Sequence, residues 1–548
     1  MIAESGIVAA MATMVRLPGN VWVRRWTRGG AAGYIRSVTI TATPPYPHAV
    51  LRPGDTCWRL ATADKMTVII DAEIYFRTVK AALRNAQHSV LIVGWDFDNR
   101  IALDPLDDDD SVPNQVGALL NHLVDTRPGL EVRVLRWDLA FLKTPLRGNT
   151  PLIVLDWMTS DRIQFKLDSH HPLNACHHQK LVVIDDSIAF CGGIDITVGR
   201  WDTPEHLDDD PRRNGPAGDP QMPWHDATVA VTGPAAQALG DLARTRWQAA
   251  TGDLPAAPLA GHDCWPAALA PDFEGVDLGI ARTIPAIEDA AAVQEIRALY
   301  LAAIASARTS IYLESQYFSA PDIAEAVALR LAEADGPEIV IINPRTADGW
   351  LEAKLMDSAR AVLLTRLHAA DVHHRLRFCT PVTAGGQDIY VHAKVLVIDD
   401  RLLRVGSSNI NRRSLATDTE CDVAIEAHDA KTSAAITRIR DTLLAEHLGV
   451  TPTRWAAALK TGNGRVVAAL DSLIGTQART LVPYVAEPLD AVELALAEAQ
   501  LLKTGVEGFA QGITGAVLNA PQRHWKLLAA LATTGVGAAM LALRLIRR

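Results

Sequence analysis

An internal repeat constrains this chain most strongly, because two segments carry the same residue pattern in the same order. Residues 81–97 align without gaps on residues 302–318, an offset of 221 positions. Each segment runs from a helical pattern into an apolar strand. A tandem duplication of this kind builds two similar units that bury equivalent strands in the same way. The sequence therefore predicts two homologous halves.

The repeat extends to a doubled motif, H-x-K-x4-D. The two copies are His178, Lys180 and Asp185 in the first half and His392, Lys394 and Asp399 in the second. Side chains two residues apart on an extended segment project from the same face, so each copy offers an imidazole beside an ammonium group. The residues after each lysine, 181–184 and 395–398, have the pattern of strands buried on both faces. Two copies in matching contexts indicate a shared site, whereas one copy would be a weak signal.

The order of the predicted elements indicates an α/β fold. Helical and apolar strand patterns alternate within each half, and we expect two α/β/α halves that form a pseudo-dimer with a helical C-terminal appendix. The expected divisions are residues 1–60 for an N-terminal extension, 61–275 for the first half, 276–450 for the second half, 451–520 for the helical appendix and 521–548 for an apolar tail.

Charge and cysteine content limit the partners. A formal net charge of -10 argues against nucleic acid as the usual partner, because phosphate binding normally requires a basic domain. Six cysteines without C-x2-C spacing indicate neither a disulfide framework nor a zinc site, which favours a reduced cytoplasmic setting. The acidic runs 107–110 and 208–210 lack the alternation of a calcium loop. We expect no metal and no cofactor.

The C-terminal tail suggests a membrane. Residues 527–543 are uncharged and lie between Lys526 and Arg544, at the short limit of about 17 residues for a spanning helix. The run is compatible with a tail anchor, with a helix in the membrane interface or with a helix docked on the protein body. We expect a cytoplasmic protein associated with the cytoplasmic membrane through this tail. The sequence does not specify an oligomeric state or a role for the N-terminal extension.

The doubled motif suits phosphodiester chemistry if its two copies meet at the interface between the halves. Two ammonium groups would offset the charge that grows on the phosphate oxygens. One imidazole could attack phosphorus while the other protonates the leaving oxygen and then activates water or an alcohol. Each ring also needs a carboxylate or carbonyl behind it. Asp202 lies 24 residues after His178 and Glu420 lies 28 residues after His392, and both are candidates for this orienting role.

These residues and their surroundings resemble the phospholipase D superfamily. The resemblance covers about residues 60 to 450 and rests on the segments 177–180, 192–195, 199–206, 223–226, 311–318 and 406–414. The segments 199–206 and 223–226 resemble the branch that cleaves phosphatidylcholine. This resemblance implies two α/β halves acting on a phospholipid without metal, and it implies no calcium.

The resemblance also implies roles for single residues. His178, Lys180, His392 and Lys394 would surround the phosphate and Asn409 would contact it, whereas Asp195 is not assigned to phosphate contact. Asp202 and Glu420 would support the histidines. Asp185 and Asp399 belong to the catalytic motif, but they look more structural than chemical. Either histidine could attack, and we choose His178.

The expected activity is cleavage of glycerophospholipids such as phosphatidylcholine. Hydrolysis or transphosphatidylation through a phosphohistidine would release the head-group alcohol, and hydrolysis would leave phosphatidic acid. A cardiolipin synthase-like phosphatidyltransferase is the alternative, followed by a nuclease of the same superfamily and by a non-catalytic membrane scaffold. Both motifs are complete, which argues against a scaffold that has lost its site.

Overall fold

The computed structural model describes residues 12–17, 21–26, 49–107, 111–138, 161–172, 175–258, 262–347 and 350–490, together with 494, 497 and 501. The chain divides into two compact units, Met1–Ala49 and Val50–Arg548. In the first unit, β1 (Ala12–Leu17) and β2 (Val21–Trp26) form an antiparallel pair. The apolar tail 521–548 lies outside the described residues. Within the described residues, no helix has the length and apolar character needed to cross a membrane.

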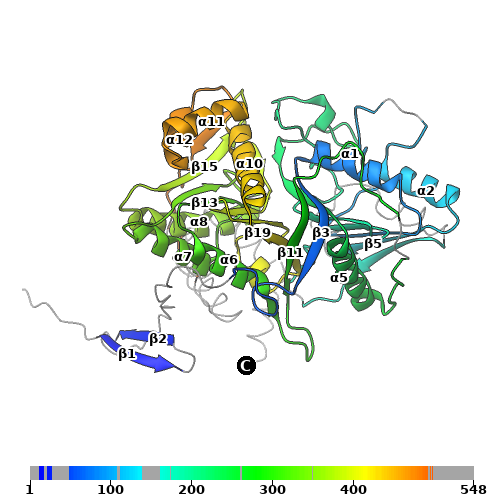
Figure 1. The fold of residues 1–548 in the computed structure, drawn as a ribbon, viewed down its shortest axis with the longest axis horizontal. Helices are drawn as coiled ribbons and strands as arrows, with labels where there is room; N and C mark the ends of the chain where they lie inside the picture. The colour runs from blue at the N-terminus through cyan, green and yellow to red at the C-terminus, as the bar shows by residue number, and fades with distance from the viewer. Residues whose placement is uncertain are drawn as a thin grey trace, which may run out of the picture. The chain divides into compact units, whose positions relative to one another are not determined.

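A continuous sheet, with sixteen strands in the described residues, runs through the second unit (Figure 1). From the centre outward, the first half contributes β3 (Arg59–Ile70), β10 (Ala227–Thr232), β8 (Ile188–Gly192), β7 (Leu181–Ile184), β4 (Ser89–Gly94), β5 (Glu131–Trp137) and β6 (Ile163–Asp168). The second half contributes β11 (Phe273–Ile284), β19 (Glu420–Glu426), β18 (Leu402–Gly406), β17 (Val395–Ile398), β13 (Ser310–Glu314), β14 (Glu338–Ile342), β15 (Leu376–Val382) and β20 (Thr480–Pro483). A short strand, β12 (Val293–Gln294), pairs with β11.

The two strand orders mirror each other about the centre of the sheet. There β3 and β11 pair antiparallel, with Ala61 opposite Leu278. In each half, three parallel strands (β4, β5 and β6, or β13, β14 and β15) lie outside the antiparallel strand that follows the motif. The tandem duplication predicted from the sequence is therefore built as a pseudo-dimer.

Helices cover both faces of each half, which confirms the predicted α/β/α layers. The first half carries α1 (Ala72–Leu83) and α2 (Val116–Thr126) on one face and α5 (Pro234–Thr251) on the other. The second half carries α6 (Glu295–Ser306), α7 (Pro321–Ala332) and α8 (Trp350–Ala370) on one face and α10 (Ala430–His447), α11 (Pro452–Thr461) and α12 (Val466–Leu473) on the other.

Both motif strands are buried on both faces, as their apolar runs predict. Val182 and Ile184 of β7 pack into the core beneath α1 and α2, whereas Leu181 and Val183 face the core that contains α5. The four residues of β17 divide between two cores in the same way. Burial on both faces holds each motif strand rigidly in the sheet.

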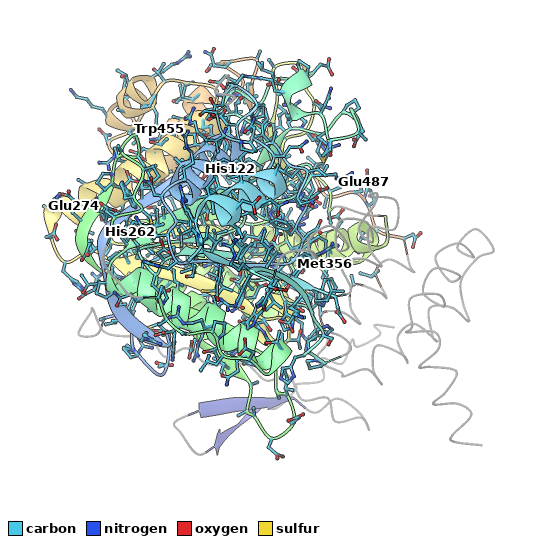
Figure 2. The ribbon with its side chains drawn as sticks, turned by 90° about the vertical axis from the view of Figure 1, so that its right-hand side faces the viewer. His122, His262, Glu274, Met356, Trp455 and Glu487 are labelled. Carbon is cyan, nitrogen blue, oxygen red and sulfur yellow. The ribbon has the colours of Figure 1, made fainter. Side chains whose placement is uncertain are left out.

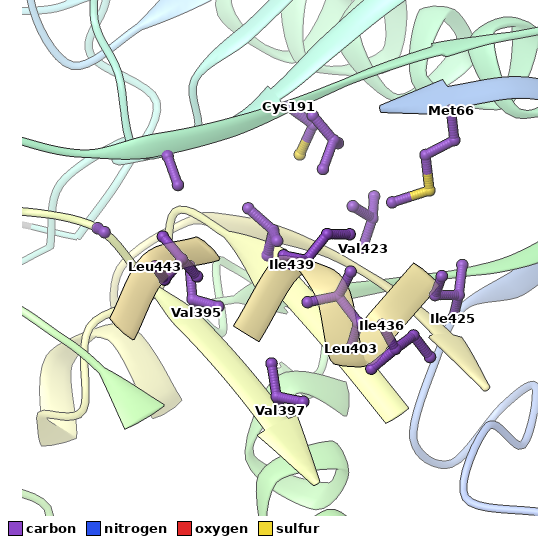
Figure 3. Close-up of a cluster of buried hydrophobic side chains, with 14 of the residues drawn as sticks. Met66, Cys191, Val395, Val397, Leu403, Val423, Ile425, Ile436, Ile439 and Leu443 are labelled. Carbon is purple, nitrogen blue, oxygen red and sulfur yellow. The ribbon is translucent and has the colours of Figure 1, made fainter. Parts of the chain in front are cut away.

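One hydrophobic core joins the two halves. Met66 and Cys191 of the first half lie in the same buried cluster as Val423 and Leu443 of the second (Figure 3). Protein interiors are close-packed and transmit small displacements, so a shared core fixes the halves against each other. The distance between the two motif histidines is therefore set by packing.

The segment after residue 450 is helical only in part. After α11 and α12 the chain forms β20, which pairs antiparallel with β15 at the edge of the sheet. Trp455 of α11 is fully buried in the core that includes α10 (Figure 2). Helices α11 and α12 and strand β20 are thus part of the second half. Position 275, where we expected the division between the halves, lies within β11.

Candidate active site

Each H-x-K triplet lies in an extended segment just before its strand, since β7 begins at Leu181 and β17 begins at Val395. Both segments are hydrogen-bonded to the opposite half. The His178 backbone N–H donates to the Thr419 carbonyl at 2.9 Å, and the His392 backbone N–H donates to the His225 carbonyl at 2.8 Å. These crossed contacts bring the two imidazole rings together, with centroids 6.4 Å apart.

A carboxylate from the opposite half lies behind each ring. His178 Nδ1 is 3.1 Å from Glu420 Oε2, and His392 Nδ1 is 2.7 Å from Asp226 Oδ2. Each carboxylate directly follows the residue whose carbonyl accepts the backbone hydrogen bond of the same histidine. One short segment therefore positions both the backbone and the ring of each histidine, and it does so across the interface.

This arrangement corrects two expectations. Asp202 does not contact a motif histidine, because its Oδ2 accepts hydrogen bonds from His206 Nδ1 at 2.9 Å and from the Trp224 backbone at 2.8 Å. Glu420 does contact a motif histidine, but the ring is His178 rather than His392. The sequence reasoning paired each histidine with a carboxylate of its own half, whereas the fold exchanges these partners.

The hydrogen-bond partners of His178 fix its tautomer. Its Nδ1 is 3.0 Å from the Ser407 carbonyl oxygen, which can only accept a hydrogen bond. Nδ1 therefore carries the hydrogen, and in the neutral ring Nε2 holds the lone pair. Burial, assisted by Lys180 and Lys394, lowers the pKa of His178 well below its usual range. Without bound substrate, His178 is thus a neutral imidazole with a nucleophilic Nε2.

His392 has surroundings similar to those of His178, with Arg200 as an additional nearby cation. Burial, together with Lys394 and Arg200, lowers the pKa of His392 well below its usual range. Burial also raises the pKa of Asp226, although Lys394 opposes that shift. Burial raises the pKa of Glu420, the carboxylate next to His178, to about 7.

The two motif lysines differ in their pairing. Lys180 Nζ lies 3.0 Å from Asp195 Oδ2, and the carbonyl of His178 accepts its hydrogen bond. Lys394 donates to the His392 carbonyl, and no carboxylate in the described residues forms an ion pair with it. Burial lowers the pKa of Lys394 to about 7, although Asp226 opposes the shift. Lys394 is therefore the cation with the most to gain from a bound phosphate.

The repeat explains this difference between the lysines. Asp195 and Asn409 occupy equivalent positions, because both are 17 residues after their motif histidine. The first half has a carboxylate that neutralises Lys180, and the second half has an amide. Asn409 is buried, and its Oδ1 has no hydrogen-bond partner among the described residues. Phosphate oxygens only accept hydrogen bonds, so Asn409 would contact a phosphate through its Nδ2 amide group.

Arg200 and two aromatic rings lie beside His392, and the sequence reasoning did not identify them as site residues. The Trp224 ring is 5.1 Å from the His392 ring and stacks on Tyr390 at 4.6 Å. The Arg200 guanidinium lies 4.2 Å from the Trp224 ring centroid, and it is buried. Arg200 lies in a segment noted for its family resemblance, but a single arginine in a long loop carries no separate signal.

The motif aspartates lie at the other end of the motif strands from the histidines. The Asp185 carboxylate accepts hydrogen bonds from the backbone N–H groups of residues 87 to 89, at 2.6 to 2.8 Å. The Asp399 carboxylate accepts from the backbone N–H groups of residues 308 to 310, at 2.8 to 3.2 Å. Each aspartate therefore joins the end of its motif strand to the start of the neighbouring antiparallel strand, β4 or β13.

The orienting role of Asp226 gives a testable prediction. Asp226→Asn should keep the shape of the residue but remove the negative charge behind His392, and we expect kcat to fall by about 10³- to 10⁴-fold, as for other histidine–carboxylate pairs. The matched control is Asp168→Asn, because Asp168 pairs at 3.1 Å with His177, which is not a motif histidine. Steady-state kinetics on both purified variants would contradict the assignment if their losses were equal.

Comparison with known proteins gives matches in both halves. Residues 162–260 match the family described as Phospholipase D, and residues 300–441 match the family described as Cardiolipin synthase, PLD-like domain. The chain is 24% identical over 474 residues to Phospholipase D A of Dictyostelium discoideum, a match that covers 70% of this chain and 35% of that protein. It is 22% identical over 490 residues to Phospholipase D alpha 4 of Arabidopsis thaliana, covering 70% of this chain and 64% of that protein.

The chain thus spans less than two thirds of the length of these relatives. Among solved structures, phosphatidylserine synthase of Haemophilus influenzae is similar with a TM-score of 0.49 and 12% identity, over 76% of this chain and 97% of that chain. Each of the two family matches contains one complete H-x-K-x4-D motif. With one matching region in each half, the chain belongs to the phospholipase D superfamily.

Proposed function

We propose that this chain is a phospholipase D-type phosphodiesterase. It would cleave glycerophospholipids such as phosphatidylcholine into phosphatidic acid and a head-group alcohol, or transfer the phosphatidyl group to another alcohol. The observation that carries the proposal is the pair of motif imidazoles, 6.4 Å apart, each with a carboxylate at its Nδ1. The relatives named phospholipase D support the same chemistry.

In the first step, His178 Nε2 attacks phosphorus and the bond from phosphorus to the head-group oxygen breaks. His392, protonated in the complex, donates the Nε2 proton to that oxygen, so that a neutral alcohol leaves. Lys180, Lys394 and Asn409 would stabilise the charge on the non-bridging oxygens. The product of this step is a phosphatidyl group bonded to His178.

In the second step, His392 acts as a base. Its neutral Nε2 accepts a proton from water or from an alcohol, and the resulting oxygen nucleophile attacks phosphorus. The bond between phosphorus and His178 breaks, which releases phosphatidic acid or a transferred phosphatidyl product. Hydrolysis and transfer therefore share one intermediate, and the available nucleophile decides between them.

The negative charge of the substrate favours the protonated His392 that the first step requires, and the proton comes from solvent. Without bound substrate, burial and the cations Lys394 and Arg200 disfavour protonated His392. A bound phosphodiester brings a negative charge next to these groups, which offsets the cations and raises the pKa of the imidazole. The site would therefore take up a proton as it binds its substrate.

The pKa of Lys394 predicts the alkaline side of the pH profile. In the free enzyme this pKa is about 7, so deprotonation of Lys394 above pH 7 removes a charge that attracts phosphate. We expect kcat/KM to fall above about pH 7. A bound phosphate raises the same pKa, so the fall in kcat should begin at a higher pH. Kinetics on a monomeric short-chain phosphatidylcholine would contradict this account if both profiles declined at the same pH.

The activity itself is tested with phosphatidylcholine vesicles and ethanol. We expect free choline, phosphatidic acid and phosphatidylethanol, and we expect all three to disappear in His178→Ala and His392→Ala. The matched control is His177→Gln, which changes the histidine next to the motif and should keep activity. If choline were released but no phosphatidylethanol formed at all ethanol concentrations tested, a phosphoenzyme shared by hydrolysis and transfer would be excluded.

A second candidate function is a cardiolipin synthase-like phosphatidyltransferase, because residues 300–441 match the family described by that name. The same intermediate would then pass its phosphatidyl group to the head-group alcohol of another lipid. Vesicles of phosphatidylglycerol distinguish the two functions, since a transferase would release glycerol and form cardiolipin faster than it releases choline from phosphatidylcholine. Absence of product from both lipids would leave the non-catalytic scaffold.

Membrane association is part of the proposal. A phospholipid substrate lies in a bilayer, so the site has to reach a membrane surface. The uncharged run 527–543 with its basic flanks supports an attachment there, and we propose that the protein acts from the cytoplasm at the cytoplasmic membrane.

A further inference from the structure

A second cluster of titratable side chains lies at the junction between the halves, outside the catalytic pair. Asp71, His206 and His225 come from the first half, and Glu446 comes from the end of α10 in the second. Their exposed fractions are 0%, 1%, 0% and 8%. Charged groups buried to this degree normally have a partner that balances them or a metal that they coordinate.

The four side chains direct their polar atoms at a common point. His206 Nε2 lies 3.6 Å from Asp71 Oδ2 and 3.4 Å from Glu446 Oε1. His225 Nδ1 lies 3.3 Å from Asp71 Oδ1 and 2.9 Å from Glu446 Oε1. Ligands at about 2.0 to 2.2 Å from a tetrahedral zinc ion are about 3.3 to 3.6 Å from one another. Three of the four separations lie in that range, and the fourth, His225 Nδ1 to Glu446 Oε1 at 2.9 Å, would have to lengthen slightly around an ion.

Hydrogen bonding accounts for only one contact of this convergence, between His206 Nε2 and Glu446 Oε1. Asp71 Oδ2 and His225 Nδ1 have no hydrogen-bond partner among the described residues, although both side chains are fully buried. His225 Nδ1 is close to two carboxylates, yet neither lies in the direction that a ring N–H requires. Other buried polar atoms of the described residues also have no hydrogen-bond partner. These two lie together in one convergent set of possible metal ligands, so a single shared partner would satisfy both.

The outer nitrogen of each ring is already committed. His206 Nδ1 donates to Asp202 Oδ2 at 2.9 Å, and His225 Nε2 donates to Glu314 Oε2 at 3.0 Å. In a neutral imidazole, a hydrogen on the outer nitrogen leaves the lone pair on the inner one. A carboxylate at the outer nitrogen is the usual support of a metal-binding histidine. Asp202, which we had expected at a motif histidine, has this supporting position instead.

A neighbouring set of three residues provides a contrast. Glu314 accepts hydrogen bonds from His225 Nε2 and from His447 Nε2, at 3.0 and 2.9 Å, and both contacts have good hydrogen-bond geometry. Protons account for both of these contacts, although His447 Nδ1 has no hydrogen-bond partner among the described residues. The two contacts of His225 Nδ1 in the convergent set lack that hydrogen-bond geometry.

We propose that Asp71, His206, His225 and Glu446 bind a divalent transition metal ion of the zinc class in a structural site. Two carboxylates balance the two charges of the ion, and four protein ligands leave no open position for substrate. The ion would join α10 of the second half to the first half. It would also hold the segment that orients a motif histidine, since the His225 carbonyl accepts the His392 backbone N–H and Asp226 is the next residue.

The competing occupant is a proton on each ring. Burial opposes the charged imidazole, but Asp71, Asp202 and Glu446 outweigh it and raise the pKa of His206 to about 9 in the absence of metal. A network of imidazolium and carboxylate groups would then hold the same residues. Metal content distinguishes the two occupants directly.

The test is elemental analysis of the untagged full chain, purified without chelator. We expect about one zinc-class ion per chain, and below about a tenth of that in Asp71→Asn and Glu446→Gln, because a neutral amide is a poor ligand for such an ion. The matched control is His447→Gln, which alters the neighbouring buried histidine of α10 but removes no ligand, and it should retain the ion. Chelator should lower the melting temperature of the wild-type chain and leave that of Glu446→Gln unchanged.

Cobalt provides a reading that does not depend on the variants folding. After removal of the native ion, the wild-type chain should bind about one Co²⁺ and show the intense visible absorption of tetrahedral cobalt. Absence of metal from the purified chain together with absence of Co²⁺ binding would overturn the proposal. Full metal content in a folded Glu446→Gln variant would also overturn it.

Discussion

Alanine at either motif histidine should lower kcat with phosphatidylcholine by about 10⁴-fold or more, because each ring supplies a step that the other cannot replace. The two variants should nevertheless behave differently with a phosphodiester whose leaving group needs no proton. His392→Ala should still release one equivalent of that leaving group in a rapid burst, because His178 can attack unaided. His178→Ala should give no burst.

Rapid-mixing measurements on a p-nitrophenyl phosphodiester would show this difference. His177→Gln serves as the control, since it alters a buried histidine whose ring contacts Asp168 and Thr419 rather than a motif side chain. A burst in His178→Ala with none in His392→Ala would reverse the assignment of nucleophile and acid. Equal residual turnover in both variants would indicate that neither histidine forms a covalent intermediate.

The second large effect concerns stability. Asp399→Ala should lower the free energy of unfolding by about 3 to 4 kcal/mol, because it leaves three backbone N–H groups and the Thr309 hydroxyl without their acceptor. Asp399 also has a φ of 56°, in the left-handed region that asparagine and aspartate tolerate better than alanine. Asp399→Asn keeps one acceptor oxygen and that tolerance, so its loss should be smaller.

Urea unfolding of Asp399→Ala and Asp399→Asn measures this effect, and kcat per folded molecule separates structure from chemistry. We expect both variants to keep kcat within a few-fold wherever they are folded. Asp185 has the same position in the first half and a φ of 52°, so Asp185→Ala should behave in the same way. A fully stable Asp399→Ala with abolished kcat would assign the aspartate to the chemistry instead.

Much of the fold follows from local pattern in the sequence. The apolar runs 181–184 and 395–398 coincide with β7 and β17, because four consecutive buried residues after a polar pair have few other places in an α/β fold. The aligned segments 81–97 and 302–318 become equivalent helix and strand pairs, as a duplication requires. The family resemblance implied a phosphate contact for Asn409 but not for Asp195, and in the structure Asp195 pairs with Lys180.

The partners of the motif histidines could not be predicted from spacing. Asp226 lies 48 residues after His178, and Glu420 lies 28 residues after His392, because the first half carries a longer insertion between equivalent strands. What the two carboxylates share is a place in the fold, since Asp226 immediately precedes β10 and Glu420 begins β19, on either side of the central strands. Only the pairing of the halves reveals that each serves the opposite ring.

The second cluster could not be predicted from the sequence, for a related reason. Its four proposed ligands lie at positions 71, 206, 225 and 446, without a spacing that a metal motif would show. Helix α10 brings Glu446 to the first half only after the two halves have packed on their shared core. Sites assembled across a pseudo-dimer interface therefore have to be found in three dimensions.

Identification of the covalent intermediate would test the account most directly. The enzyme would be mixed with phosphatidylcholine, quenched within one turnover under conditions that preserve phosphohistidine, digested and examined by mass spectrometry. We predict a phosphatidyl adduct on the peptide that contains His178 and none on the peptide that contains His392. An adduct on His392, or turnover without an adduct on either histidine, would contradict the mechanism.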